Sequence, residues 1–65
     1  MSQSQQILEH LESGETLTPA EALQSFGCFR LAARIADLRR DGHDIETILI
    51  RNGRAAYASY RLVNA

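Results

Sequence analysis

The side chains best suited to chemistry in this chain of 65 residues are seven arginines, which all lie after residue 29. A guanidinium group is planar and can donate two parallel hydrogen bonds to a phosphate or to the major-groove edge of guanine. The chain has no lysine, so arginine supplies every basic side chain. The seven are Arg30, Arg34, Arg39, Arg40, Arg51, Arg54 and Arg61. Their chemistry indicates a polyanionic partner.

Charge is divided unevenly along the chain. Residues 1–29 carry four glutamates and no basic side chain, which gives a charge of −4. Residues 30–65 carry seven arginines and four acidic side chains, which gives +3, and the two parts together make the net charge of −1. The sequence therefore predicts that a negatively charged partner binds the C-terminal part.

The remaining reactive side chains do not form a catalytic pattern. Nucleophilic catalysis and metal binding both need cysteine, histidine and carboxylate groups that converge on one point. His10 and His43 lie far apart in the chain, and Cys28 is the only cysteine. We therefore expect no enzymatic activity, metal, cofactor or small-molecule ligand, and we expect Cys28 to be a small buried residue.

The chain also lacks the segments that direct a protein to a membrane or out of the cell. No apolar run approaches the roughly 20 residues of a membrane span. The first residues do not show the basic and then apolar order of a signal peptide. We expect a cytoplasmic protein in which residues 1–65 form a single domain.

Local signals predict three helices, at about residues 5–13, 19–26 and 29–41. The clearest signal belongs to the second helix, where Thr18 can cap the N-terminus, Pro19 takes the first position and Glu21 follows three residues after the cap. Gly27 suits the left-handed residue that ends a helix. Helical spacing predicts these buried residues: Ile7, Leu8 and Leu11, then Ala20, Leu23 and Phe26, and finally Leu31, Ile35 and Leu38.

The sequence also predicts the environment of three further side chains. Leu17 should reach the core from a short extended piece before the second helix. His10 should point outward from the first helix. Phe29, at the start of the third helix, could stack or wedge against a nucleic acid, but an aromatic residue at such a position more often packs against the protein. We interpret Phe29 as a staple against Phe26 or against the hairpin that follows.

We predict a β-hairpin at residues 45–63, because β-branched and aromatic residues surround Asn52-Gly53. If Arg51 and Arg54 flank the turn, one face carries Ile45, Thr47 and Leu49 and packs on the helices. The other face carries an apolar patch formed by Ile48, Ile50 and Tyr57. An uncovered patch would indicate either a contact between two copies of the chain or a different strand register.

The order of elements and one run of residues resemble a known family. The run Leu31-Ala32-Ala33-Arg34-Ile35-Ala36-Asp37-Leu38-Arg39-Arg40-Asp41-Gly42-His43-Asp44-Ile45, followed by Asn52-Gly53 and Tyr60-Arg61-Leu62, resembles winged helix-turn-helix domains of small bacterial and bacteriophage regulators. It is also similar to the N-terminal repressor domain of biotin ligase. The resemblance implies an α+β fold with three helices followed by a two-stranded antiparallel wing.

The same resemblance implies how the domain would bind double-stranded DNA. Its third helix would enter the major groove, and the wing and the neighbouring backbone would hold phosphates. On the third helix the expected contact residues are Arg30, Ala33, Arg34 and Arg40. At the tip of the wing they are Arg51 and Arg54. Arg39 points to the side and Arg61 lies on a strand, so both could serve the structure alone.

Two other interpretations stay open at this point. The arginines could form a solvated surface, paired with Asp37, Asp41 and Glu46. The domain could also be a protein-interaction module without DNA binding, because winged helices sometimes hold another protein with the same surface. We favour a sequence-specific DNA-binding protein, a transcriptional regulator or an accessory factor of a phage or mobile element, with a possible homodimer contact through Ile48, Ile50 and Tyr57.

Overall fold

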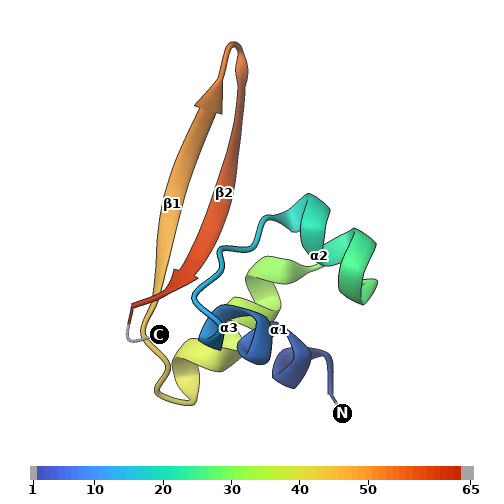
Figure 1. The fold of residues 1–65 in the computed structure, drawn as a ribbon, viewed down its shortest axis with the longest axis vertical. Helices are drawn as coiled ribbons and strands as arrows, with labels where there is room; N and C mark the ends of the chain where they lie inside the picture. Colours follow the sequence, from blue (N-terminus) through green and yellow to red (C-terminus); the bar gives the residue numbers. More distant parts are fainter. Residues whose placement is uncertain (1, 64–65) are drawn as a thin grey trace.

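Three helices and a long β-hairpin make up the fold, which is the α+β winged helix-turn-helix architecture that the sequence predicts (Figure 1). The computed structural model describes residues 2–63. The elements follow one another as α1 (Gln3–Glu12), α2 (Pro19–Phe26), α3 (Leu31–Arg40), β1 (Ile45–Asn52) and β2 (Ala55–Leu62). The third helix begins two residues later than the sequence analysis expects, and the first begins two residues earlier.

Hydrogen bonds fix both ends of α2. The hydroxyl of Thr18 accepts from the N–H of Glu21 at 3.2 Å, and the Glu21 carboxylate accepts from the N–H of Thr18 at 3.0 Å. These two bonds form the predicted capping box. The helix ends at Gly27, whose φ of 64° is left-handed and whose N–H donates to the carbonyl of Leu23.

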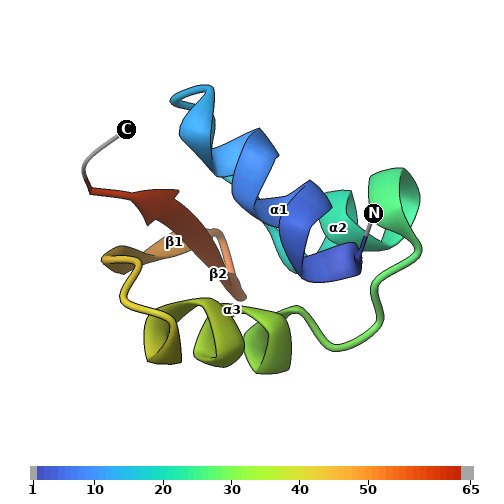
Figure 2. The same cartoon turned by 90° about the horizontal axis from the view of Figure 1, so that it is seen from below.

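The core lies between α1 and α3, which face each other beside the base of the hairpin (Figure 2). The predicted buried residues of α3 are confirmed, and those of α1 are confirmed except that Leu8 is only half-buried. The buried hydrophobic residues are Ile7, Leu11, Leu17, Ala22, Cys28, Leu31, Ile35, Leu38, Ile45 and Tyr60. Cys28 is thus a small buried residue, as predicted. None of the three described helices is long and apolar enough to cross a membrane.

The predicted buried stripe of α2 is wrong. Ala22 is fully buried, whereas Leu23 is 44% exposed and Ala20 is exposed. Phe26 lies four residues after Ala22, about 40° around the helix from it, and is half-buried. Helix α2 therefore packs on its small residue, which lets it lie close to its neighbours, and it is rotated from the orientation that its larger side chains suggested.

Phe29 and His10 also differ from expectation, and for a shared reason. Phe29 is 86% exposed, so it is not a staple. The ring of His10 packs edge-on against the ring of Phe26, with 5.8 Å between their centroids. His10 is accordingly half-buried instead of outward-pointing. Because His10 already covers Phe26, the partner expected for Phe29 is occupied.

A short backbone bridge joins the hairpin to the helices. Leu17 and Tyr60 pair in antiparallel fashion, with N–H to carbonyl distances of 3.0 and 2.9 Å. Leu17 therefore lies in an extended piece that reaches the core, as predicted. From this base the hairpin rises away from the helices as a wing (Figure 1).

The turn of the wing lies one residue further along than predicted. Asn52 pairs with Ala55, which leaves Gly53 and Arg54 as a two-residue turn. Only Gly53 has a positive φ there, 64°, and no residue other than glycine has one within residues 2–63. A glycine at the first turn position is the requirement of a type II′ turn, whereas a type I′ turn over Asn52-Gly53 would need a positive φ at Asn52.

The changed register preserves the faces of the wing but not their predicted burial. Ile45 and Tyr60 share one face and are buried at the base. Thr47 and Leu49 lie on the same face but are exposed, Leu49 by 58%, so the prediction that this face packs on the helices holds only at the base. The upper part of the wing has no helix beside it on that face, because the hairpin projects from the body.

The cap of α2 gives a test of this fold. Changing Thr18 to alanine removes the acceptor for the Glu21 N–H, and we expect the free energy of unfolding to fall by about 1 kcal/mol. Urea unfolding followed by circular dichroism measures it. Thr16→Ala is the matched control, because the Thr16 side chain is exposed and makes no hydrogen bond within the described chain. Equal losses in both variants would show that the cap is not responsible.

Candidate nucleic-acid interface

The outer face of α3 combines small residues with arginines. Because Leu31, Ile35 and Leu38 point into the core, the opposite side of the helix meets solvent. Ala36 is exposed there and Ala33 is half-buried. Because alanine side chains are small, another molecule can approach the backbone of this face closely. The predicted contact residues Arg30, Ala33, Arg34 and Arg40 all belong to this one helix or to its N-cap.

An aspartate lies between two of these arginines. The carboxylate of Asp37 is 3.3 Å from the guanidinium of Arg34 and 3.5 Å from that of Arg40. The Arg40 side chain is 75% exposed, and exposed ion pairs contribute only about 0–1 kcal/mol. Either arginine can therefore exchange Asp37 for a phosphate at little cost. The sequence analysis named Asp37 as an ion-pair partner of the arginines in its alternative interpretation, and the structure shows it paired with two of them.

Arg30 stands at the start of the same helix without such a partner. It is the N-cap residue of α3, it is exposed, and its side chain forms neither a capping hydrogen bond nor an ion pair with residues 2–63. The N-terminus of a helix carries a partial positive charge. Arg30 adds a full charge at the same point.

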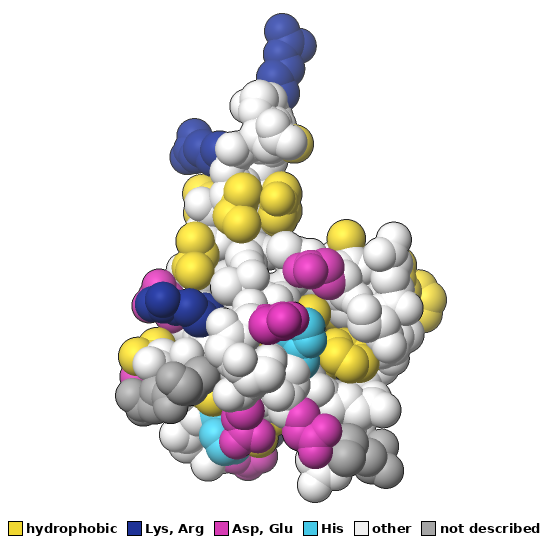
Figure 3. Space-filling view, in the orientation of Figure 1, with side chains coloured by type: hydrophobic (Ala, Val, Ile, Leu, Met, Phe, Trp, Pro, Cys, Tyr) yellow, Lys and Arg dark blue, Asp and Glu magenta, His cyan; other side chains and the backbone are white. Residues whose placement is uncertain are grey.

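Two more exposed arginines lie at the tip of the wing. Arg51 is opposite Ala56 near the end of β1, and Arg54 is in the turn itself. Both are exposed, and neither forms an ion pair with another residue of the described part. Figure 3 shows basic side chains at the far end of the wing, well away from the helical body.

Arg39 and Arg61 both make contacts within the protein. The Arg39 guanidinium donates to the carbonyl of Ile45 at 2.7 and 3.1 Å and to the hydroxyl of Thr47 at 2.9 Å. It thereby ties the end of α3 to the start of β1. Arg61 pairs with Glu46 across the wing at 3.2 Å. These contacts give both arginines a place within the protein and are compatible with the structural role that the sequence analysis considered for them.

Acidic side chains gather on another side of the molecule. In the view of Figure 3 the helical body shows acidic side chains, while the basic ones in sight lie along the wing. The four glutamates of the first 29 residues, all exposed, are Glu9, Glu12, Glu15 and Glu21. Helix α3 lies at the far side of this view (Figure 1). The segregation of charge along the chain is therefore also a segregation in space.

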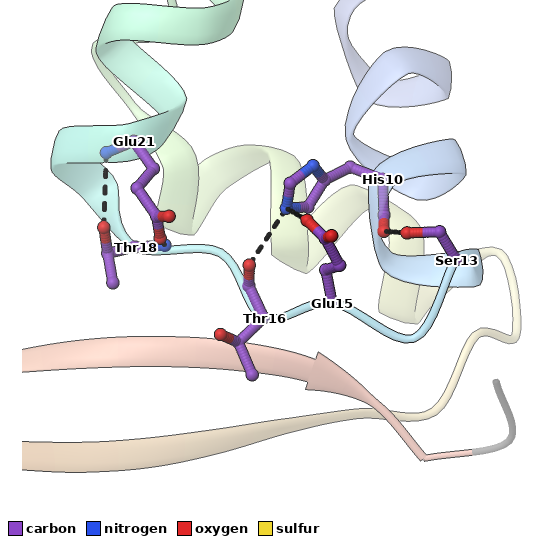
Figure 4. A network of polar contacts seen from close by, with 6 residues as sticks. All are labelled: His10, Ser13, Glu15, Thr16, Thr18 and Glu21. Atoms are coloured by element: carbon purple, nitrogen blue, oxygen red, sulfur yellow. Dashed lines mark hydrogen bonds and ion pairs between the residues drawn. The ribbon is translucent and has the colours of Figure 1, made fainter.

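On this acidic side, polar contacts of His10 join the end of α1 to the connection that leads to α2. The Nε2 of His10 is 2.9 Å from the carbonyl of Thr16, to which it donates, and 3.7 Å from the carboxylate of Glu15 (Figure 4). Ser13 donates to the carbonyl of His10 at 2.6 Å. Within residues 2–63 no three His, Cys, Asp or Glu side chains are arranged to hold a metal ion. These contacts position the connection between α1 and α2.

A shallow groove of about 700 Å³ separates the wing from the start of α2. Its walls are Thr16, Thr18, Pro19, Ala20, Glu21, Ile50, Tyr57 and Ser59. Of the predicted apolar patch, Ile48 and Ile50 are half-buried and Tyr57 is 43% exposed. Ile50 and Tyr57 of the patch therefore line a groove of their own molecule, and Tyr57 is still open to solvent.

Comparison with known proteins gives one family. The model of a family described as winged helix-turn-helix domain matches residues 2–65. No curated protein and no solved structure matches the chain. The match covers α3 and the wing together, so it includes both groups of exposed arginines.

The different contacts of the neighbouring residues Arg39 and Arg40 predict different contributions to stability. Arg39→Met removes the hydrogen bonds to Ile45 and Thr47, so we expect a loss of about 1 kcal/mol in the free energy of unfolding. Arg40→Met removes the same charge but only an exposed ion pair, so its unfolding should stay within about 0.5 kcal/mol of the original chain. Urea unfolding compares the two. A larger loss for Arg40→Met would contradict these roles.

Proposed function

The chain belongs to the winged helix-turn-helix domain family, and we propose that it binds double-stranded DNA. Winged helix-turn-helix domains in general bind DNA by placing the second helix of the motif in the major groove. In this chain that helix is α3. The proposal assigns the major groove to Arg30, Ala33, Arg34 and Arg40, and the DNA backbone to Arg51 and Arg54.

The observation that carries the proposal is where the exposed arginines without an ion-pair partner lie. Arg30, Arg51 and Arg54 are exposed and make no ion pair within residues 2–63. Arg39 instead donates hydrogen bonds to β1, and Arg61 lies opposite Glu46 near the base of the wing, away from its tip. Phosphate contacts fix the register of a protein on the duplex, and contacts to base edges select the sequence. Two separate basic groups, one on a helix and one on a wing, suit these two tasks.

The acidic side restricts the orientation of the complex. A DNA surface carries about one negative charge per 1.7 Å of axis, so it repels the glutamates of α1 and of the α2 N-terminus. Binding from the α3 side keeps these glutamates away from the phosphates. The net charge of −1 is therefore compatible with DNA binding, because the local charge at the interface is positive.

The resemblance to small regulators supports a finer proposal. We place the chain among sequence-specific DNA-binding proteins that act as transcriptional regulators or as accessory factors of a phage or mobile element. Base-edge contacts from α3 would supply the specificity. Winged helices that hold another protein instead of DNA remain the alternative, and the groove beside the wing would serve that role.

Salt dependence tests the proposal. The three contact arginines of α3 and its N-cap would lie beside the phosphates that border the major groove as well as beside base edges, so with Arg51 and Arg54 five arginines would neutralise phosphates. This gives a slope of about −4.5 for log K against log salt, which is a loss of affinity of a few hundredfold between 50 and 200 mM. Fluorescence anisotropy with a labelled mixed-sequence duplex of about 20 base pairs measures it. In the Arg51→Gln, Arg54→Gln double variant we expect the slope to become shallower by about two.

Arg61→Gln is the matched control for this test, because Arg61 also lies on the wing but opposite Glu46 at its base, away from the tip. Its slope should equal that of the original chain. If the wing-tip double variant has the same slope as the original chain, the wing does not reach the DNA. No binding at 50 mM salt would reject the DNA proposal in favour of the protein-interaction module.

We also propose that two copies associate through the face of Ile48, Ile50 and Tyr57 when they bind adjacent DNA sites. A single domain buries modest surface, so a second linked contact would raise the affinity. Tyr57→Ser should lower the fraction of two-copy complexes in sedimentation velocity with a two-site duplex. Leu49→Ser is the control, because Leu49 lies on the opposite face and is more exposed than Tyr57. Loss of association in Leu49→Ser alone would place the contact on the other face.

A further inference from the structure

Phe29 is the most exposed large hydrophobic residue of the described chain. Its exposed fraction of 86% compares with 58% for Leu49 and 44% for Leu23. It lies in the turn between α2 and α3, directly before the N-cap residue Arg30. An aromatic side chain left in water at this point does not contribute its hydrophobic surface to folding.

The exposure of Phe29 does not come from a loose turn. On one side, Cys28 is 97% removed from solvent and its N–H donates to the carbonyl of Ala22. On the other side, Leu31 is buried in the core with 3% exposure. Gly27 has the left-handed conformation that closes α2. Phe29 is therefore held outward between two anchored neighbours, and little conformational freedom would be lost if it met a partner.

The location of Phe29 limits what that partner can be. In Figure 2 the connection from α2 runs into the first turn of α3, on the side of the molecule away from α1. In the proposed complex the first residues of α3 lead into the major groove. The apolar group that base pairs present in the major groove is the C5-methyl of thymine. Wedge residues that unstack bases, by contrast, act from the minor groove.

We infer that Phe29 is a specificity-determining residue that packs against a thymine methyl group where α3 enters the major groove. This inference rests on the proposed DNA binding and adds the base that the domain selects there. Arg30, next to it, supplies charge for the adjacent phosphate or guanine, so the pair would combine one apolar contact with one charged contact. The domain would then prefer thymine at one position of its site for a reason that involves no hydrogen bond.

The test removes the methyl group without changing the base pairing. A preferred duplex is first selected from a random-sequence pool with the full chain, and each thymine is then replaced by deoxyuridine in turn. At one position we expect the affinity to fall by about fourfold, which corresponds to one buried methyl group. With Phe29→Ala, the thymine and deoxyuridine duplexes should bind equally well at that position.

Leu49→Ala is the matched control, since it also shortens an exposed apolar side chain but lies on the wing. It should keep the fourfold preference for thymine. Phe29→Leu keeps an apolar side chain and should keep part of the preference. Circular dichroism of Phe29→Ala should match the original chain, because the removed ring is in solvent.

The possible results separate this inference from the proposed function. A thymine preference that disappears only in Phe29→Ala supports the inference. Tight, salt-sensitive binding in which no methyl group matters, or in which Phe29→Ala retains the full preference, overturns the inference while DNA binding stands. Absence of binding to any duplex at low salt overturns both.

Discussion

The pairing of Leu17 with Tyr60 is the interaction on which the arrangement of the whole molecule depends. Each residue donates its N–H to the carbonyl of the other, and both side chains are buried. A two-stranded hairpin is marginal in water on its own, so the wing needs this attachment to the helices. Arg39 adds a second attachment from the end of α3 to β1. Together they fix where the wing leaves the body, and thus where its tip lies relative to α3.

The parts of the fold that were predictable from the sequence depend on short-range physics. Thr18 and Glu21 cap α2 through bonds between residues three apart, and Gly27 ends the helix because its backbone can take a positive φ. The stripe that starts at Leu31 follows the period of a ten-residue helix. Such features need no knowledge of the rest of the molecule.

The parts that could not be predicted depend on which neighbour is present. Helix α2 has eight residues, so the prediction of its buried face depends on two or three side chains. Leu23 was predicted to be buried, but it is exposed and Ala22 is buried instead. The ring that packs against Phe26 is that of His10, from α1, and not that of its near neighbour Phe29, which is exposed. The turn residues Asn52-Gly53 fit one turn type and Gly53-Arg54 another, and both contain the same glycine. For the candidate site, the sequence named Asp37 and Glu46 as possible ion-pair partners, but which arginines they hold depends on how the side chains lie in space.

The upper wing lies far from the body, because the hairpin rises from the Leu17–Tyr60 bridge and exposes Leu49 and the residues around Gly53. Such a segment contributes little to the core, and exposed hairpin tips are where proteins tolerate inserted residues best. The length and composition of the tip are therefore free to vary while the helices keep their packing. The contacts that the tip makes with a partner could thus change during evolution, or be engineered, with little risk to the folding of the domain.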